Sequence, residues 1–379
     1  MSSRMKIFVD AHAFDAGFQG TQTFIRELYT SLIGLHPELD IYWGAYHADR
    51  IQAAFPSVNP VNILPYKKEN GGLRRFLFDI PAYLKQHRFN FAHFQYISPR
   101  QQDNCRYIVT LHDVLYKTFP GDFSWTYRAA RNFLFGKSIK DAAIKTTVST
   151  YSQQKIARYY DIAPSRIHVI PNGVNEAFAK FGYDKKAAAE LIAEKFGIRN
   201  FVLYVSRVEP RKNHALLLKK HISLGLFDRG IALVFIGDDS VNVDALQGLI
   251  ATLTPKQKAL FFCLPQVAQD DLTAFYSACR LFVYPSKAEG FGIPPLEAAI
   301  CRAPVLCSSA TAMSNFDFFE PHTFNPEDEY DFEHQYLQMI DAPPTETTLN
   351  HIAETVANRY QWQRSSELFY DLLQTDNQL

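Results

Sequence analysis

Short apolar runs alternate with longer amphipathic segments along the whole chain. In the first half, seven runs of four to six residues are predicted to be strands, and the first of them is a short apolar run that ends in a polar residue. They are Lys6–Asp10, Ile41–Tyr46, Val61–Leu64, Phe91–Phe94, Tyr107–Leu111, Thr146–Ser149 and Ile167–Ile170. Segments with helical periodicity, such as 73–86 and 152–160, lie between most of them.

The pattern starts afresh in the second half, after a polar helical stretch at 184–195. Strands are predicted at Phe201–Ser206, Ala232–Gly237, Leu260–Leu264, Leu281–Tyr284 and Pro304–Cys307, with helical segments such as 270–279 between them. Strands that alternate with helices predict parallel sheets covered on both faces. A chain of 379 residues is long enough for two such domains.

One of these strands is followed by a turn that favours an anion. The run Leu281–Tyr284 ends at a Pro-Ser pair, and Gly290 and Gly292 then let the backbone turn tightly. Pro294 and Pro295 suit the first turn of a helix, where their missing N–H groups are no loss. Because the N–H groups and the dipole of a helix N-terminus attract negative charge, the turn is predicted to bind an anion.

Two carboxylates, Glu289 and Glu297, bracket the same turn. A carboxylate is repelled by a phosphate, so each is better suited to accept hydrogen bonds from neutral hydroxyls. A phosphate flanked by two sets of hydroxyls describes a sugar nucleotide. The alternative is a glycine-rich turn with two solvated glutamates.

A second anion site is predicted after the strand Phe201–Ser206. Arg207, Arg211 and Lys212 place three cations within six residues at the carboxyl end of that strand. Arginine suits bidentate contacts with a phosphate and lysine acts as a point charge, although a loop of solvated charges is the alternative. Gly237 ends the next strand, where a backbone without a side chain would let a base or ribose approach.

The two glutamates, eight positions apart around Gly-Phe-Gly-Ile-Pro-Pro-Leu, resemble the E-x7-E signature of retaining glycosyltransferases with the GT-B fold, family 4 in particular. Arg207 and Lys212 resemble the R-x4-K pair of that family, and Pro171-Asn-Gly-Val174 resembles its hinge tetrapeptide. Trp362 resembles the tryptophan of the family's C-terminal helix. The resemblance covers nearly the whole chain.

The resemblance implies an α/β fold of the GT-B type, with two Rossmann-like domains that face each other across a cleft. The N-terminal domain, at 1–173, would bind the acceptor. The C-terminal domain, at 174–360, would bind the nucleotide sugar. A C-terminal helix within 361–379 would cross back to the first domain.

The resemblance also implies roles for individual residues. Arg207 and Lys212 would neutralise the departing diphosphate, Glu289 would hold sugar hydroxyls and Glu297 would hold the ribose. The candidate catalytic residues are Arg207, Lys212, Glu289 and His112, the candidate donor-binding residues are Gly20, Gly237, Gly290, Phe291, Gly292 and Glu297, and the candidate acceptor residue is Asp113.

His112 and Asp113 directly follow the strand Tyr107–Leu111. An imidazole beside a carboxylate can be held in one tautomer and one orientation. The pair resembles the His-Asp pair on the acceptor side of the family's cleft, which implies that His112 positions the sugar. The alternative is a histidine with a purely structural role.

Gly20 belongs to a loop, Ala16–Thr21, that resembles the glycine loop facing the donor phosphates in this family. The alternative is an ordinary turn from a strand to a helix. His93 and His168 lie inside strand-like runs and are interpreted as structural residues.

The stretch 117–140 combines large aromatic residues with Arg128, Arg131, Lys137 and Lys140. A basic helix with large aromatics can lie on an anionic membrane surface, which would suit a lipid-linked acceptor. A helix that packs on the sheet and has a solvated basic face is the alternative, and the one that we favour from the sequence.

Composition narrows the classes of protein. Lys+Arg and Asp+Glu are both 39, which argues against a nucleic-acid binder that relies on bulk charge. Five cysteines without a C-x-x-C pattern are typical of reduced thiols in a cytoplasmic protein.

No signal peptide and no membrane-spanning run is recognisable, so we expect a cytoplasmic protein or one peripheral at the inner face of the membrane. Asp238-Asp239 is not a D-x-D motif, and no metal ion is predicted.

The predicted function is a retaining, metal-independent transfer of a hexose from a nucleoside-diphosphate sugar to a glycan or lipid-linked glycan. The stretch Leu203–Asn213 resembles mannosyl- and deoxyhexosyltransferases of bacterial surface polysaccharides, lipopolysaccharide among them, which favours a GDP-sugar donor and no further cofactor. Two alternatives stay open from the sequence. One is a nucleotide-sugar 2-epimerase of the same fold, and the other is a non-catalytic subunit that binds nucleotide sugar.

Overall fold

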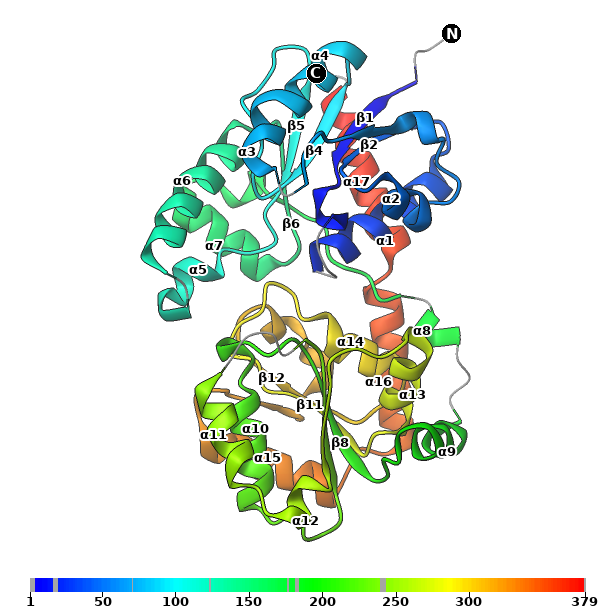
Figure 1. The fold of residues 1–379 in the computed structure, drawn as a ribbon, viewed down its shortest axis with the longest axis vertical. Helices are drawn as coiled ribbons and strands as arrows, with labels where there is room; N and C mark the ends of the chain where they lie inside the picture. The colour runs from blue at the N-terminus through cyan, green and yellow to red at the C-terminus, as the bar shows by residue number, and fades with distance from the viewer. Residues whose placement is uncertain are drawn as a thin grey trace. The chain divides into compact units, whose positions relative to one another are not determined.

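The structure is a computed structural model that describes residues 4–15, 20–69, 71–122, 124–175, 177–180, 184–238 and 243–377. The chain divides into two compact units, one made of residues 1–173 and 361–379 and the other of residues 174–360. The division expected from the sequence falls at the same residues. Figure 1 shows both units, and each is described by itself.

The first unit is built on a seven-stranded sheet in the order β3-β2-β1-β4-β5-β6-β7, with parallel neighbours throughout. Its central strands are buried on both faces, as parallel strands covered by helices must be. The strands are β1 Lys6–Asp10, β2 Asp40–Ala45, β3 Ile63–Pro65, β4 Phe91–Gln95, β5 Arg106–Thr110, β6 Ile144–Thr147 and β7 His168–Val169.

Helices connect these strands, and the last helix of the chain returns to this unit. A π-helical turn at Arg75–Asp79 joins α3 to α4. The helices are α1 Gly20–Leu35, α2 Ala48–Ala54, α3 Gly72–Arg74, α4 Ile80–His87, α5 Leu115–Thr118, α6 Trp125–Asp141, α7 Thr150–Tyr160 and α17 Trp362–Asn377. The helix expected to cross back to the first unit is α17.

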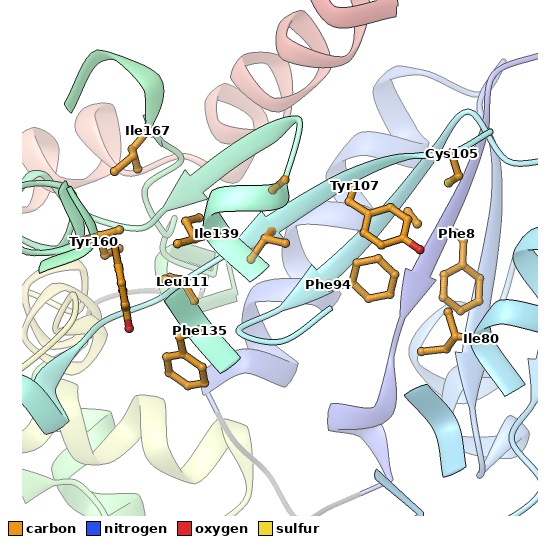
Figure 2. Close-up of a cluster of buried hydrophobic side chains, with 14 of the residues drawn as sticks. Phe8, Ile80, Phe94, Cys105, Tyr107, Leu111, Phe135, Ile139, Tyr160 and Ile167 are labelled. Carbon is orange, nitrogen blue, oxygen red and sulfur yellow. The ribbon is translucent and has the colours of Figure 1, made fainter. Parts of the chain in front are cut away.

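The two faces of this sheet carry different helices. Phe94 points into a large apolar cluster that joins β1, β4 and β5 to α4, α6 and α7, and Figure 2 shows part of it, including Phe8, Ile80 and Tyr107. The neighbouring residue of β4, His93, points to the opposite face because side chains alternate along a strand. There its ring lies 5.2 Å from that of Phe369 in α17. Helices α1 and α17 therefore cover the second face.

The second unit has a six-stranded parallel sheet in the order β10-β9-β8-β11-β12-β13. Its strands are β8 Phe201–Val205, β9 Ala232–Ile236, β10 Phe261–Leu264, β11 Leu281–Tyr284, β12 Val305–Ser308 and β13 Thr323–Phe324. Its helices are α8 Ala177–Lys180, α9 Lys185–Phe196, α10 His214–Ser223, α11 Asp244–Thr252, α12 Pro255–Lys258, α13 Gln269–Ala278, α14 Ile293–Ile300, α15 Glu329–Asp341 and α16 Glu346–Arg359.

Each sheet reverses its strand order once. In the first unit the chain runs from β1 through β2 to β3 and then returns to β4 on the other side of β1. In the second unit it runs from β8 to β10 and returns to β11 on the other side of β8. Doubly wound sheets bind their ligands beyond the carboxyl ends of the strands at such a switch point.

Some elements of the structure differ from those predicted. Residues 117–140 are not one helix: α5 ends at Thr118, and a 3-10 turn at Pro120–Asp122 precedes α6 because a proline and a glycine interrupt helical hydrogen bonding. Val61 belongs to a 3-10 turn that starts at Pro60, so β3 begins two residues later than predicted. The two-residue strand β13 was too short to recognise.

Candidate active site

Lys212 and Glu289 form a buried ion pair at the switch point of the second unit, beyond the ends of β8 and β11. Nζ of Lys212 lies 2.6 Å from Oε1 of Glu289 and donates a longer hydrogen bond of 3.3 Å to the hydroxyl of Tyr284. That hydroxyl donates to the same carboxylate oxygen at 3.0 Å. Only 9% of Lys212 and 7% of Glu289 are exposed. The fold thus brings together two candidate catalytic residues that are 77 positions apart.

The two members of this pair keep each other charged. Burial raises the pKa of the Glu289 carboxyl, but the charges of Lys212 and Arg211 outweigh burial and hold that pKa at about 2. Burial lowers the pKa of Lys212, and the carboxylate of Glu289 opposes this effect. Glu289 is therefore ionised at neutral pH, and its charge favours the ammonium form of Lys212.

Arg211, for which no role was predicted from the sequence, ties the loop after β8 to the loop after β11. Its guanidinium donates to the carbonyl of Ala288 at 2.8 Å and lies 2.7 Å from Oε2 of Glu209. Arg207, whose side chain is 54% exposed, lies 2.9 Å from Oε1 of the same carboxylate. Glu209 therefore links a fixed arginine to an exposed one. Glu209 was not among the residues predicted from the sequence.

Gly237 holds this loop close to the end of β9. Its φ is +147°, and a Cβ at this position would lie 2.1 Å from the carbonyl oxygen of Ser206. Since that neighbour is backbone, a larger residue would have to displace the loop that carries the cations. Contact between Gly237 and a base or ribose remains a prediction.

The glycine turn after β11 leads into α14 as the sequence predicts. Gly292 has a φ of +96° and precedes the helix, and Pro294 and Pro295 lie in its first turn. Gly290, which is partly buried, precedes Phe291. Binding of an anion at the backbone of residues 290–292 remains a prediction.

Side chains on both sides anchor this turn. Phe291 is buried, and its ring lies 5.7 Å from that of Tyr360. The N–H of Glu289 donates to Oγ1 of Thr311 at 2.9 Å. The backbone at Glu289 is therefore fixed independently of its carboxylate, which is the arrangement that a preorganised site requires.

Glu297 lies on α14 and is partly buried. Its Oε2 accepts a hydrogen bond of 2.9 Å from the hydroxyl of Tyr276 on α13. The ribose contact expected for Glu297 remains a prediction.

His112 lies in the first unit, two residues after the end of β5, and is 9% exposed. Its Nε2 lies 2.7 Å from Oε1 of Gln95, whereas Asp113 accepts the N–H of Leu115, the first residue of α5, at 3.1 Å. The expected pairing of the imidazole with its neighbour Asp113 is therefore replaced by a bond to Gln95. Burial lowers the pKa of His112 to about 4, so the ring is neutral at pH 7.

A buried charged cluster at the end of β1 was missed. Asp10 is completely buried, accepts the hydroxyl of Tyr66 at 2.7 Å, and lies 3.3 Å from His12 and 3.5 Å from Arg75. Burial raises the pKa of Asp10, but Arg75, His12 and Tyr66 together hold that pKa well below its usual range. The sequence signal that could have indicated this cluster is Asp10 itself, a carboxylate at the end of a predicted strand.

Gly20 is the first residue of α1 and is exposed, while residues 16–19 of the expected glycine loop lie outside the described residues. Asp239 of the Asp-Asp pair also lies outside them. Among the residues that the structure describes, no group of three or more His, Cys, Asp or Glu side chains could hold a metal ion. Within the same residues, none of the helices is long and apolar enough to cross a membrane.

Comparison with known proteins gives two family matches. Residues 18–178 match the model of Glycosyltransferase Family 4, and residues 188–315 match that of Glycosyl transferases group 1. Together the two matches span most of the chain. They fall mainly in the first and the second unit, respectively.

Several curated relatives are mannosyltransferases by name. The serotype-specific mannosyltransferase WbdA of Escherichia coli is 29% identical over 238 residues, which are 61% of this chain and 29% of the relative. The O-antigen chain mannosyltransferase B of Escherichia coli is 30% identical over 213 residues, or 55% of this chain and 54% of the relative. The chain thus matches less than two thirds of the length of these relatives.

Solved structures show the same fold at low sequence identity. Sucrose-phosphate synthase from Thermosynechococcus elongatus has a TM-score of 0.75 at 19% identity and covers 98% of this chain and 99% of its own. HepE from Anabaena, solved with UDP and glucose, has a TM-score of 0.72 at 17% identity. The match covers 98% of this chain and 100% of the HepE chain. With its two Rossmann-like sheets and its matches to both family models, the chain belongs to the family 4 glycosyltransferases of the GT-B fold.

Proposed function

We propose that this chain is a retaining glycosyltransferase that moves a hexose, with mannose or a deoxyhexose favoured, from a nucleoside diphosphate to a glycan or lipid-linked glycan. The observation that carries the proposal is the buried Lys212–Glu289 pair at the switch point of the second sheet. The names of the relatives, which include O-antigen mannosyltransferases, support mannose as the sugar and surface polysaccharide as the product.

The charges around this pair suit a diphosphate. Three cations, Arg207, Arg211 and Lys212, lie with two carboxylates, Glu209 and Glu289, which leaves an excess of one positive charge. An ammonium group has three N–H donors, and Glu289 and Tyr284 occupy two of those of Lys212. The third can donate to a phosphate oxygen while Glu289 keeps the ammonium in place.

The two glutamates of the site offer acceptors for the hydroxyl groups of the donor's sugar and ribose. Glu289 accepts from Lys212 and Tyr284 through Oε1, and its Oε2 lies 3.5 Å from Nη1 of Arg211; since a carboxylate offers about four acceptor positions, Oε2 can also accept a sugar hydroxyl. Glu297, held by Tyr276, would accept from the ribose. The transition state separates an oxocarbenium-like sugar from a diphosphate, so the cations gain most when the leaving group gains charge.

A thermal-shift screen tests this proposal, because a ligand that binds the folded protein raises its unfolding temperature by mass action. We expect GDP and GDP-mannose to raise it more than UDP, ADP and dTDP and their sugars. A larger shift with UDP-sugars would exclude the guanosine donor. No shift with any nucleotide would contradict the proposal. Conversion of the nucleotide sugar into its epimer without an acceptor would identify a 2-epimerase instead.

The proposed reaction needs no metal ion, because Arg207 and Lys212 supply the positive charge that neutralises the departing diphosphate. We therefore expect the rate of transfer to be unchanged in excess EDTA. The measurement is steady-state transfer with and without the chelator. Loss of turnover in EDTA and its recovery with Mg²⁺ or Mn²⁺ would contradict a metal-free mechanism.

We further propose that α6 docks on an anionic membrane at the cytoplasmic face, where a lipid-linked acceptor would lie. The helix carries Arg128, Arg131, Lys137 and Lys140 against a single acid, Asp141. The second half of the helix packs on the sheet through Phe135 and Ile139, while other large apolar side chains along the helix are exposed, namely Trp125 (75%), Phe133 (69%), Tyr127 (41%) and Leu134 (38%). Exposed aromatics beside cations are what an interfacial helix presents to lipid headgroups.

Vesicle binding tests this docking. The protein should co-sediment with vesicles that contain anionic lipid at low salt and be released at high salt, because screening weakens the attraction. Replacing Trp125 and Phe133 together with serine should reduce binding. Tyr330→Ser, which removes an aromatic that is 79% exposed on α15, should leave binding unchanged. Equal binding to neutral vesicles, or none to either kind, would contradict the proposal.

A further inference from the structure

Thr311, in the loop after β12, has a backbone conformation that its side chain disfavours. Its φ is +56°. A positive φ is uncommon outside glycine, and for a β-branched residue it is a genuine outlier. Among the residues that the structure describes, Thr311 is the only β-branched one with a positive φ. Strained residues cluster at functional sites, where the surrounding structure holds them in place.

The order of the strands explains why this residue lies beside the candidate site. β12 is the neighbour of β11 in the second sheet, and the two strands are parallel. The loops that follow them therefore leave the sheet at the same edge, where ligands of such sheets bind. The loop after β11 carries Glu289 and the glycine turn. The loop after β12 leads into a 3-10 turn at Thr311–Asn315, which we call the β12 segment.

The β12 segment contacts both ends of the glycine turn. At the first end, Oγ1 of Thr311 accepts the N–H of Glu289 at 2.9 Å. At the other end, a Cβ on Gly292 would lie 3.0 Å from Cγ of Met313, which is 1% exposed. One segment therefore supports the turn from the residue that carries the carboxylate to the residue that precedes α14.

Several contacts keep Thr311 in its strained conformation. Its carbonyl accepts the hydroxyl of Ser314 at 2.7 Å, and the N–H of Met313 donates to the carbonyl of Ala310 at 3.2 Å. Met313 is also fixed by its burial. The N–H of Glu289 has no other acceptor among the described residues, so without the threonine hydroxyl it would be left unpaired in a buried residue.

We propose that Thr311 is a positioning residue for glycosyl transfer. Its hydroxyl fixes the backbone at Glu289, so that one carboxylate can meet both the ammonium of Lys212 and the sugar of the donor. The strained backbone is what places the hydroxyl within reach of that N–H. This role rests on the proposed function, in which Glu289 holds hydroxyls of the donor sugar.

Amide hydrogen exchange tests the bond without any substrate. Thr311→Val keeps the branch at Cβ and removes the acceptor, whereas Thr311→Ser keeps the hydroxyl and removes the branch. In NMR of the full chain, the amide of Glu289 should be protected in the unaltered protein and in Thr311→Ser, and should exchange at least about tenfold faster in Thr311→Val. Fast exchange in the unaltered protein, or equal exchange in all three, would overturn the proposal.

Steady-state kinetics and calorimetry then test the role in transfer. Thr311→Val should lower kcat between about tenfold and a hundredfold, because a small displacement of a positioning group has a large effect on rate, and Thr311→Ser should restore it. The affinity for GDP, which carries no sugar, should be unchanged in both variants. Thr323→Val, a matched change that removes a hydroxyl bonded to Glu320 in the same unit, should alter neither kcat nor the exchange of the Glu289 amide.

These outcomes separate the positioning role from the general function. If Thr311→Val kept its kcat, Thr311 would have only a structural role and the proposal would fail, while activity of the unaltered protein would still support the proposed function. Equal losses of GDP affinity and kcat in Thr311→Val would indicate general disruption of the site, and would also overturn the positioning role.

Discussion

Replacing Lys212 with alanine is expected to lower kcat by about 10²–10³-fold, with a smaller loss of donor affinity. Loss of one hydrogen-bond donor from a preorganised, water-poor site typically has this cost, about 2.7–4 kcal/mol. The effect falls on kcat because the charge of Lys212 is worth more as the diphosphate leaves than when the donor is bound. The measurement is steady-state kinetics on variants whose circular dichroism shows that they are folded.

Three further variants sharpen this test. Lys219→Ala removes a lysine of α10 that is 53% exposed and pairs with Glu329, and it should leave kcat unchanged. Arg207→Lys should also reduce kcat, because a point charge cannot replace a planar fork. The double variant of Arg207 and Lys212 should lose less than the product of the two single losses, since both residues act on one diphosphate. Near-normal turnover in Lys212→Ala would remove the central element of the mechanism.

Replacing Glu289 with glutamine is expected to destabilise the folded chain by about 3–5 kcal/mol, the usual cost of removing one partner of a buried ion pair. The amide keeps the shape of the side chain but leaves the buried ammonium of Lys212 without its countercharge, whereas Arg211 keeps its closer partner Glu209. Urea unfolding measures the change. Glu327→Gln, which breaks a surface pair with Lys287, should change stability by less than about 0.5 kcal/mol.

The same residue makes a prediction about acid stability. Because the pKa of Glu289 is about 2 in the folded protein and its ordinary value is 4.5, its contribution is complete above about pH 4.5 and is lost as the pH falls towards 2. The unaltered protein should therefore lose more stability than Glu289→Gln between pH 4.5 and pH 2. Equal losses in the two proteins would contradict the pairing of Glu289 with Lys212.

Much of the fold could be predicted from local pattern. The apolar runs of β1, β4 and β8 are short, buried on both faces and followed by polar residues, so periodicity alone was sufficient to identify them. The turn into α14 could be predicted because Gly292 needs a positive φ and Pro294 and Pro295 suit only a first helical turn. These signals depend on a few neighbouring residues.

The site could be predicted only in part because its contacts join distant segments. The sequence identified Lys212 and Glu289 as candidates but could not show that they pair with each other, since strand order decides which loops meet. Arg211 was passed over because its partner Ala288 offers only a backbone carbonyl, which has no signature in the sequence. Gln95 was missed because glutamine at the end of a strand carries no chemistry until His112 lies beside it.

One measurement tests the central claim most directly, namely that the site around Lys212 and Glu289 transfers a sugar from a nucleoside diphosphate with retention. The enzyme, GDP-α-mannose and a mannose-terminated glycan are followed by proton NMR from the start of the reaction. The account predicts an α-linked product that appears at the same rate as free GDP, in the unaltered protein and far more slowly in Lys212→Ala. A β-linked product, or an epimerised nucleotide sugar without release of GDP, would contradict it.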